Sequence, residues 1–184
     1  MTPYARVFGV RAMAAMAFAP MAKAERPDGP QASPWQHVEQ QVGGSFIEME
    51  YSRPGVKGRK VYGTELVPYD GTMWRAGANE RTSITFSSDV TVNGQALKAG
   101  TYGLLVIATE KEWTWVFSKD FMTHGTEGYD AKNDALRVKA APQAAEHAER
   151  LVYEFNDVTD DSVKIDLRWE KIRCGFEVKV AAAK

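Results

Sequence analysis

Hydrophobic and polar residues alternate along most of the chain, with the two-residue period of strands that bury one face. The alternation first appears over residues 38–51, where Gly43-Gly44 separates two alternating runs and predicts a hairpin turn. A second run, Thr82–Val92, is predicted as one strand. It ends at Asn93-Gly94, a dipeptide that favours a hairpin turn because both of its positions tolerate positive φ.

The middle of the chain predicts further strands. Residues 102–108 are apolar almost throughout, as in a strand that is covered on both faces. Trp113, Trp115 and Phe117 share one face of the next strand, and we expect them in the core. Shorter elements are predicted as well: strands at 60–62, 136–140 and 150–155, a helical turn at 129–135, and an alanine-rich connector at 142–146.

The C-terminal part shows the strictest alternation. Residues 163–169 place apolar side chains at odd positions, and residues 174–180 place them at even positions. This pattern predicts a final hairpin with its turn at Glu170-Lys171, and it places Trp169 and Cys174 in the core.

About ten short strands follow from these patterns, with a turn signal roughly every 8–12 residues and no long segment of helical period. The sequence therefore predicts an all-β, single-domain antiparallel β-sandwich or jelly roll. A closed β-barrel is the alternative, because it produces the same alternation.

The first 24 residues have the pattern of an export signal. Arg6 and Arg11 precede an apolar run at 12–21, and Ala22-Lys23-Ala24 fits the small-x-small rule for cleavage. The apolar run is far shorter than the roughly 20 residues that cross a bilayer, so no membrane span is expected. We interpret residues 1–24 as a signal peptide, 25–34 as a flexible lead-in, and 35–184 as the sandwich domain of a periplasmic or extracellular protein.

Charge and cysteine content restrict the possible partners. Removal of residues 1–24 takes away three basic and no acidic residues, which changes the formal net charge from −1 to −4. Nucleic-acid binding is not expected from such a chain, because it requires a basic face. The single cysteine, Cys174, cannot form an internal disulfide, so stability must come from the core.

The segment Trp74–Arg81 concentrates large polar groups at the entrance to a predicted strand. Trp74 beside Arg75 forms either a stacking platform with a charged donor or a core residue with a brace for the loop. Glu80 is a candidate acid, base or ligand anchor, with a plain ion pair as the alternative. Gly77 is expected to supply positive φ, and Asn79 to cap the turn.

A second candidate is the loop at 52–59, which carries Arg53, Lys57 and Arg59 between glycines and a proline. Three cations on one loop suit a carboxylate, sulfate or phosphate, although such a cluster can also be solvated. The nucleotide-binding phosphate loop is absent from the sequence.

Other chemistry is weakly represented. His37, His124 and His147 show no metal-ligand spacing, and only Asp120 and His124 share a loop, so no metal site is predicted. No G-x-S-x-G motif occurs, and Cys174 falls on an apolar face. No cofactor is indicated.

Several motifs resemble those of a bacterial family known as domain-of-unknown-function family 2911. They are Tyr51-Ser-Arg-Pro-Gly-Val-Lys-Gly-Arg59, Leu66-Val-Pro-Tyr69, Trp74-Arg-Ala-Gly-Ala-Asn-Glu80, Ala99-Gly-Thr-Tyr-Gly-Leu104 and Asp134-Ala-Leu-Arg-Val138. The resemblance covers most of the chain after about Ala32. It implies export but brings no activity, substrate or catalytic residues. Members usually have Trp at the position of His124.

The sequence thus favours an exported β-sandwich that binds a small polar or anionic ligand, such as a carbohydrate, or a partner protein. A hydrolase or lyase that uses Glu80 with Arg75 and Tyr69 is the enzymatic alternative, and a structural envelope protein without a pocket is the third. The predicted ligand-binding residues are Arg53, Arg59, Tyr69, Trp74, Arg75, Asn79 and Glu80.

Overall fold

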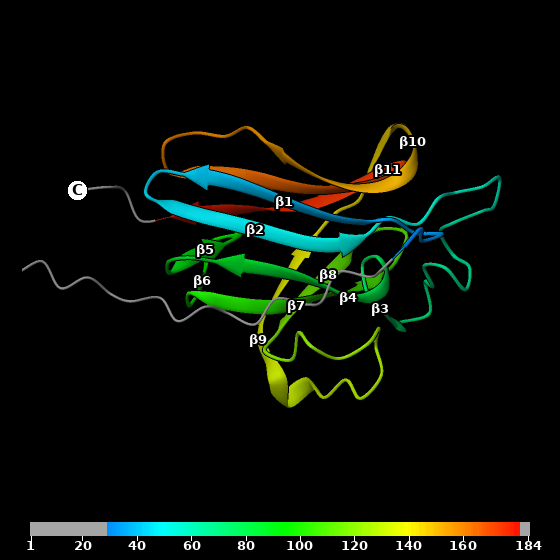
Figure 1. Cartoon of the computed structure of the whole chain (residues 1–184), viewed down its shortest axis with the longest axis horizontal. Helices are drawn as coiled ribbons and strands as arrows, with labels where there is room; N and C mark the ends of the chain where they lie inside the picture. Colours follow the sequence, from blue (N-terminus) through cyan, green and yellow to red (C-terminus); the bar gives the residue numbers. More distant parts are fainter. Residues whose placement is uncertain (1–28, 181–184) are drawn as a thin grey trace, which may run out of the picture.

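The computed structural model describes residues 29–180, which form eleven strands and one 3₁₀ turn (Figure 1). The predicted signal peptide, residues 1–24, lies outside the described residues. The elements in chain order are β1 (Trp35–Val42), β2 (Ser45–Ser52), β3 (Met73–Trp74), β4 (Ala78–Phe86), β5 (Val90–Val92), β6 (Gln95–Leu97), β7 (Gly100–Ala108), β8 (Trp113–Ser118), η1 (Ala131–Asn133), β9 (Asp134–Ala140), β10 (Gln143–Asn156) and β11 (Ser162–Val180).

The strands form two antiparallel sheets. One has the order β1-β2-β4-β7-β8-β9, with β3 paired to β7 as well, and the other has the order β10-β11-β5-β6. Neither sheet closes on itself, since each order has two ends. The predicted β-sandwich is confirmed, and the alternative of a closed barrel is wrong.

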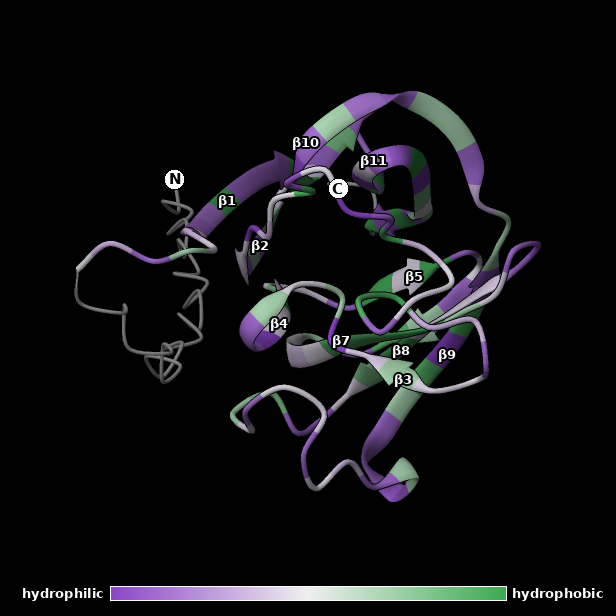
Figure 2. Ribbon diagram, turned by 90° about the vertical axis from the view of Figure 1, so that its right-hand side faces the viewer, coloured by the Kyte–Doolittle hydropathy of each residue, from purple (hydrophilic) through white to green (hydrophobic). Residues whose placement is uncertain are grey.

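Aromatic side chains join the sheets across the core. Trp74 stacks on Trp169 with ring centres 6.2 Å apart, and it meets Trp113 edge to face at 6.1 Å. Phe176 contacts Trp115 and Phe117 at 5.1 and 5.2 Å. In Figure 2 the hydrophobic stretches of β5 and β8 lie in the centre of the molecule, and the hydrophilic β1 lies at its periphery. The aromatics predicted for the core are therefore there.

The predicted single strand Thr82–Val92 is wrong, because the chain changes sheets within it. β4 ends at Phe86 in the larger sheet, and β5 begins at Val90 in the smaller one. The hydroxyl of Ser87 accepts from the backbone N–H of Phe46 at 2.7 Å, and the carboxylate of Asp89 accepts from that of Ala99 at 2.9 Å. These polar side chains satisfy backbone donors near residues 87–89, where the chain changes sheets. The apolar alternation continues on either side, so the sequence pattern does not reveal the change.

The predicted C-terminal hairpin is a single bent strand, and its two arms pair with other strands. Strand β11 is continuous, but its direction reverses at Glu170, which has φ 53°. Gly175 lies so close to Ile165 and Asp166 that a Cβ on Gly175 would overlap the Ile165 carbonyl oxygen. In a straight strand these positions would be roughly 33 Å apart. The first arm pairs with β10 and the last three residues pair with β5.

Three shorter predictions meet different outcomes. The alanine-rich connector at 142–146 is wrong, because β10 already begins at Gln143 and follows the bend of β11. The strand at 60–62 is reduced to an isolated bridge between Tyr62 and Val67. The helical turn near 129–135 is present as η1, which the carboxylate of Asp130 caps by accepting from the N–H of Lys132.

Candidate functional site

Trp74 belongs to the core rather than to a surface platform. Its relative exposure is 6%, and its ring lies between Trp113 and Trp169. Tyr69 stacks at 6.3 Å on Tyr62, whose hydroxyl donates to the carbonyl of Trp169 at 3.1 Å. Both aromatic rings of the predicted site therefore pack against the core.

The backbone around Gly77 is special, though not as predicted. Ala76 and Asn79 are the left-handed residues, with φ of 52° and 57°. Gly77 is required for space, because a Cβ there would lie 2.6 Å from the hydroxyl oxygen of Thr82. The Asn79 amide fixes the segment by donating to the Ser52 hydroxyl and the Ser33 carbonyl, both at 3.2 Å.

Arg75 and Glu80 do not pair with each other. The Arg75 guanidinium donates to the carbonyl of Asn79 at 2.6 Å and packs directly against Gly125. Glu80 is solvent-exposed, and its carboxylate lies 3.2 Å from Nδ1 of His124. Arg75 is thus a brace, and Glu80 forms a surface pair with a residue of the 119–128 loop.

The basic loop is held together by its own arginines. Arg53 donates to the carbonyl of Leu151 at 2.9 Å. Arg59 donates to the carbonyls of Gly55 and Val56 at 2.7 and 3.1 Å. The Arg53 bond attaches the loop to β10, and the Arg59 bonds close the loop on itself, while Lys57 stays exposed. Among the predicted site residues, Arg75 is bonded to Asn79, the two loop arginines to backbone carbonyls, and Glu80 to His124.

Arg81, which was not predicted as a site residue, anchors the 119–128 loop. Its side chain has no exposed surface and donates to the carbonyls of Asp120, Gly125 and Glu127 at 2.7, 3.0 and 3.3 Å. The Asp120 carboxylate lies 3.1 Å from the same guanidinium. Hydrogen bonds from Thr123 and the charge of Arg81 lower the pKa of Asp120. Asp120 and His124 thus bind different partners and do not form a joint ligand pair.

Cys174 is an inert core thiol. Burial raises its pKa to about 12, so the nucleophilic thiolate is scarcely populated at neutral pH. This placement confirms the expectation from the apolar face of its strand.

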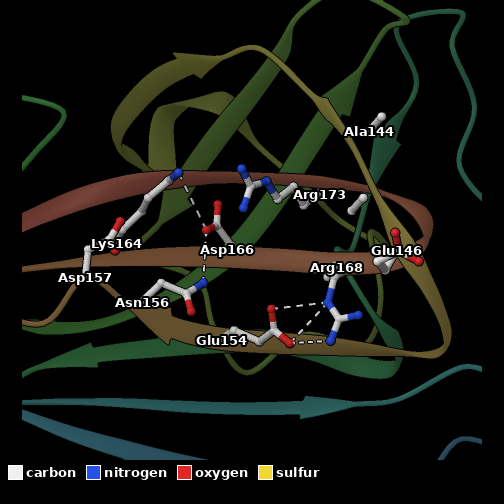
Figure 3. Close-up of a pocket in the computed structure, with 10 residues that line it drawn as sticks. Ala144, Glu146, Glu154, Asn156, Asp157, Lys164, Asp166, Arg168 and Arg173 are labelled. Carbon is white, nitrogen blue, oxygen red and sulfur yellow. Dashed lines mark hydrogen bonds and ion pairs between the residues drawn. The ribbon is translucent and has the colours of Figure 1, made fainter.

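A polar groove lies where β10 and β11 bend back (Figure 3). Its volume is about 720 Å³, within the usual range of small-molecule sites. Glu154 and Arg168 form a two-pronged ion pair on its wall, with N–O distances from 2.5 to 3.2 Å. The lining residues are Ala144, Ala145, Glu146, Glu154, Asn156, Asp157, Lys164, Asp166, Arg168 and Arg173.

Asp166 is the buried charge of the groove, with a relative exposure of 3%. The amide of Asn156 donates to its carboxylate at 3.1 Å, and the Lys164 ammonium lies 3.7 Å away. Arg173 donates only to the side-chain carbonyl of Gln143, at 2.9 and 3.2 Å. In the part of the chain that the structure describes, no carboxylate lies within ion-pair distance of Arg173.

Sequence reasoning missed the groove because its residues alternate outward from the apolar faces and look like an ordinary solvated surface. The available signal was the change in parity between 163–169 and 174–180, together with Gly175. A reversal there brings Lys164 and Asp166 near Arg173, as the close approach of Gly175 to Asp166 demonstrates.

Within residues 29–180, no helix has the length and apolar character needed to cross a membrane. Comparison with curated proteins and with solved structures gave no match. Comparison with family models matched residues 33–178 to the family described as "Protein of unknown function (DUF2911)". This match spans most of the chain and includes β1 to β10, all of β11 except its last two residues, the Arg81 network and the groove. The chain belongs to the DUF2911 family.

Proposed function

We propose that this protein is an exported binding module that holds a small polar ligand in the β10–β11 groove. The ligand carries one anionic group and several hydroxyls, as an acidic sugar does. The observation that carries the proposal is Arg173, which lines a groove of about 720 Å³ and has only a neutral amide as its described partner.

Arg173 provides the anion subsite. A guanidinium can donate five N–H bonds, and Arg173 uses only its Nε and one Nη for Gln143. Lys164 is already paired with the buried Asp166 carboxylate, so the ligand carboxylate binds on the side of Arg173 that faces away from Asp166. Arg173 could bind it there with paired hydrogen bonds.

The remaining lining residues suit hydroxyl groups. Glu146 and Asp157 are acceptors that make no described ion pair, and Asn156 and the Glu154–Arg168 pair add fixed polar groups. Sugar hydroxyls both donate and accept, so a lining with both functions can satisfy them. Ala144 and Ala145 are the only apolar residues of this lining.

The Trp74 segment is not our proposed ligand site, because Trp74 is buried and Arg75 is bound to a carbonyl. The enzymatic alternative also lacks support. In the described part of the chain, Glu80 contacts His124 and makes no hydrogen bond or ion pair with Arg75 or Tyr69.

Export is supported by the sequence of residues 1–24 and is part of the proposal. N-terminal sequencing of protein from the exported fraction should begin at Glu25. Full-length protein retained in the cytosol would contradict it.

Ligand binding, the other part of the proposal, is tested by calorimetry on the mature chain. The probes are galacturonate, galactose and inorganic phosphate. We expect galacturonate to bind more tightly than galactose, and Arg173→Ala to weaken galacturonate binding at least tenfold. Lys111→Ala removes an exposed cation outside the groove lining and is the matched control. Binding that is absent for all three probes, or equally strong in both variants, would refute the proposed site.

A further inference from the structure

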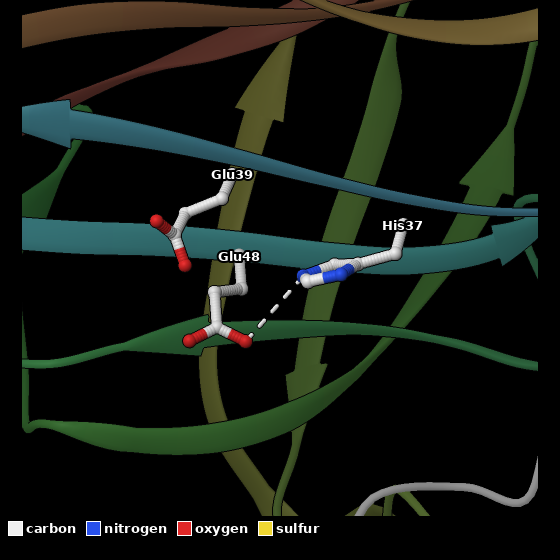
Figure 4. A group of neighbouring side chains, drawn as sticks. All are labelled: His37, Glu39 and Glu48. Atoms are coloured by element: carbon white, nitrogen blue, oxygen red, sulfur yellow. Dashed lines mark ion pairs between the residues drawn. The ribbon is translucent and has the colours of Figure 1, made fainter.

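A second cluster of candidate ligands lies on the β1–β2 hairpin at the edge of the larger sheet, outside the groove lining. The cluster consists of His37, Glu39 and Glu48 (Figure 4). A ring nitrogen of the histidine and one carboxylate oxygen of each glutamate all lie within 4.8 Å of one another. His37 and Glu39 are two residues apart on β1, so both side chains project from the same face. In the view of Figure 4 the His37 ring extends toward the Glu48 side chain, and the Glu39 carboxylate lies on the other side of Glu48.

The strand register places two like charges in direct opposition. Glu39 is the Cα partner of Glu48 across the hairpin, and His37 is the partner of Glu50. Like charges directly opposite each other destabilise an antiparallel pair. A bound cation would turn this repulsion into a favourable arrangement.

The imidazole of His37 has a donor atom without a hydrogen bond. Its Nε2 is shielded from solvent and makes no hydrogen bond, although an oxygen of Glu48 lies 3.5 Å away. A buried nitrogen without a partner is costly, because its solvation is lost without replacement. The ring of Trp35 lies with its centre 6.2 Å from that of His37 and limits the orientations of the imidazole.

We propose that His37, Glu39 and Glu48 form a Zn²⁺ site with three protein ligands. Zinc binds imidazole nitrogen and carboxylate oxygen at about 2.0–2.2 Å, so tetrahedral ligands lie about 3.3–3.6 Å apart. The observed separations of up to 4.8 Å exceed this by at most about 1.5 Å, a gap that rotations of the two glutamate side chains close. At least one coordination position remains for water or an anion.

The ligand set also discriminates between metals. Calcium needs six to eight oxygen ligands, and magnesium keeps most of its waters. One imidazole nitrogen with two carboxylates instead favours zinc and its transition-metal neighbours. The sequence prediction of no metal site considered histidine spacing and the Asp120–His124 pair on one loop, whereas these ligands come from two paired strands.

The experiment is zinc titration of the mature, untagged chain by calorimetry, with Co²⁺ absorption as a spectroscopic check. We expect one Zn²⁺ per chain, much weaker binding of Ca²⁺ and Mg²⁺, and a loss of zinc affinity on the order of tenfold or more in His37→Ala and in Glu48→Gln.

His147→Ala is the matched control. His147 also lies 3.5 Å from a glutamate, Glu149, two residues along the same strand, but it belongs to no three-ligand group among residues 29–180. Its zinc affinity should match the wild type, and circular dichroism should show that all variants fold. Equal affinities in His37→Ala and His147→Ala, or no stoichiometric binding, would overturn the proposal. Arg173→Ala should bind zinc normally, which separates this site from the groove.

Discussion

Two aspartates with arginines nearby, the partly exposed Asp120 and the buried Asp166, mark two different kinds of charged cluster in this protein. At the 119–128 loop, Arg81 is fully covered, and three backbone carbonyls and Asp120 occupy its donors. In the groove, Arg173 is exposed and bonds only to the Gln143 side chain. Asp166 below it is held by Asn156 and Lys164.

The difference lies in how many donors the fold has already used. A buried guanidinium is tolerated only when its hydrogen bonds are satisfied, which makes Arg81 part of the structure. An exposed guanidinium with free donors contributes little to the stability of the fold. Arg173 is therefore available for the ligand that we propose. The residue type is the same, and the number of backbone carbonyls around it separates the two roles.

The largest expected effect comes from Arg81→Ala. This change removes the donor of three backbone carbonyls and the charge partner of Asp120, whose carboxylate keeps the Thr123 hydroxyl. Each carbonyl that is left buried and unsatisfied costs about 1–3 kcal/mol. Chemical denaturation should show this loss, whereas Arg173→Ala should change the free energy of unfolding by less than about 1 kcal/mol. Similar losses in the two variants would remove the distinction between the clusters.

The groove itself is tested by Gly175→Ala. A Cβ at this position overlaps the backbone of Ile165, so the two arms of β11 must separate, at a cost of about 2–3 kcal/mol. Gly44→Ala provides the control, because nothing lies within 4 Å of a Cβ there. A melting temperature for Gly175→Ala equal to that of the control would show that the arms are not in close contact.

The smallest effect is a dependence on pH at Asp120. Its pKa is lowered in the folded state, so the stabilisation is present above the unfolded value near 3.9 and is lost as pH falls through the folded pKa. Acid titration of unfolding should therefore show a steeper loss of stability below about pH 4 in the wild type than in Asp120→Asn. Parallel curves would indicate that Asp120 is no better stabilised in the folded protein.

Much of the fold was predictable because β-strands leave a local signal. Alternation and Asn93-Gly94 identified the hairpins, and the sheets confirm them. The error at 87–89 arises because the chain changes sheets there while its apolar alternation continues. At Glu170 the predicted reversal is present, but it lies within one continuous strand. Alternation reports which face is buried, but it does not report which sheet the strand joins.

The candidate sites were less predictable, since they depend on contacts between distant segments. Arg81 could not be distinguished from Arg75 without knowing that the 119–128 loop covers it. The zinc ligands are different, because the predicted Gly43-Gly44 turn already fixes the pairing of Glu39 with Glu48. Counting residue pairs outward from this turn gives the register of the two strands, and that register places His37, Glu39 and Glu48 together from the sequence alone.

The change of sheet between β4 and β5 has a consequence for motion. Ser87, Ser88 and Asp89 connect β4 of one layer to β5 of the other, and the chain crosses between the layers again from β6 to β7 and from β9 to β10. Such short tethers oppose the sliding or opening of the layers as separate bodies. We therefore expect native-state hydrogen exchange to report one cooperative opening, in which the amides of β4 and β5 share the same protection free energy.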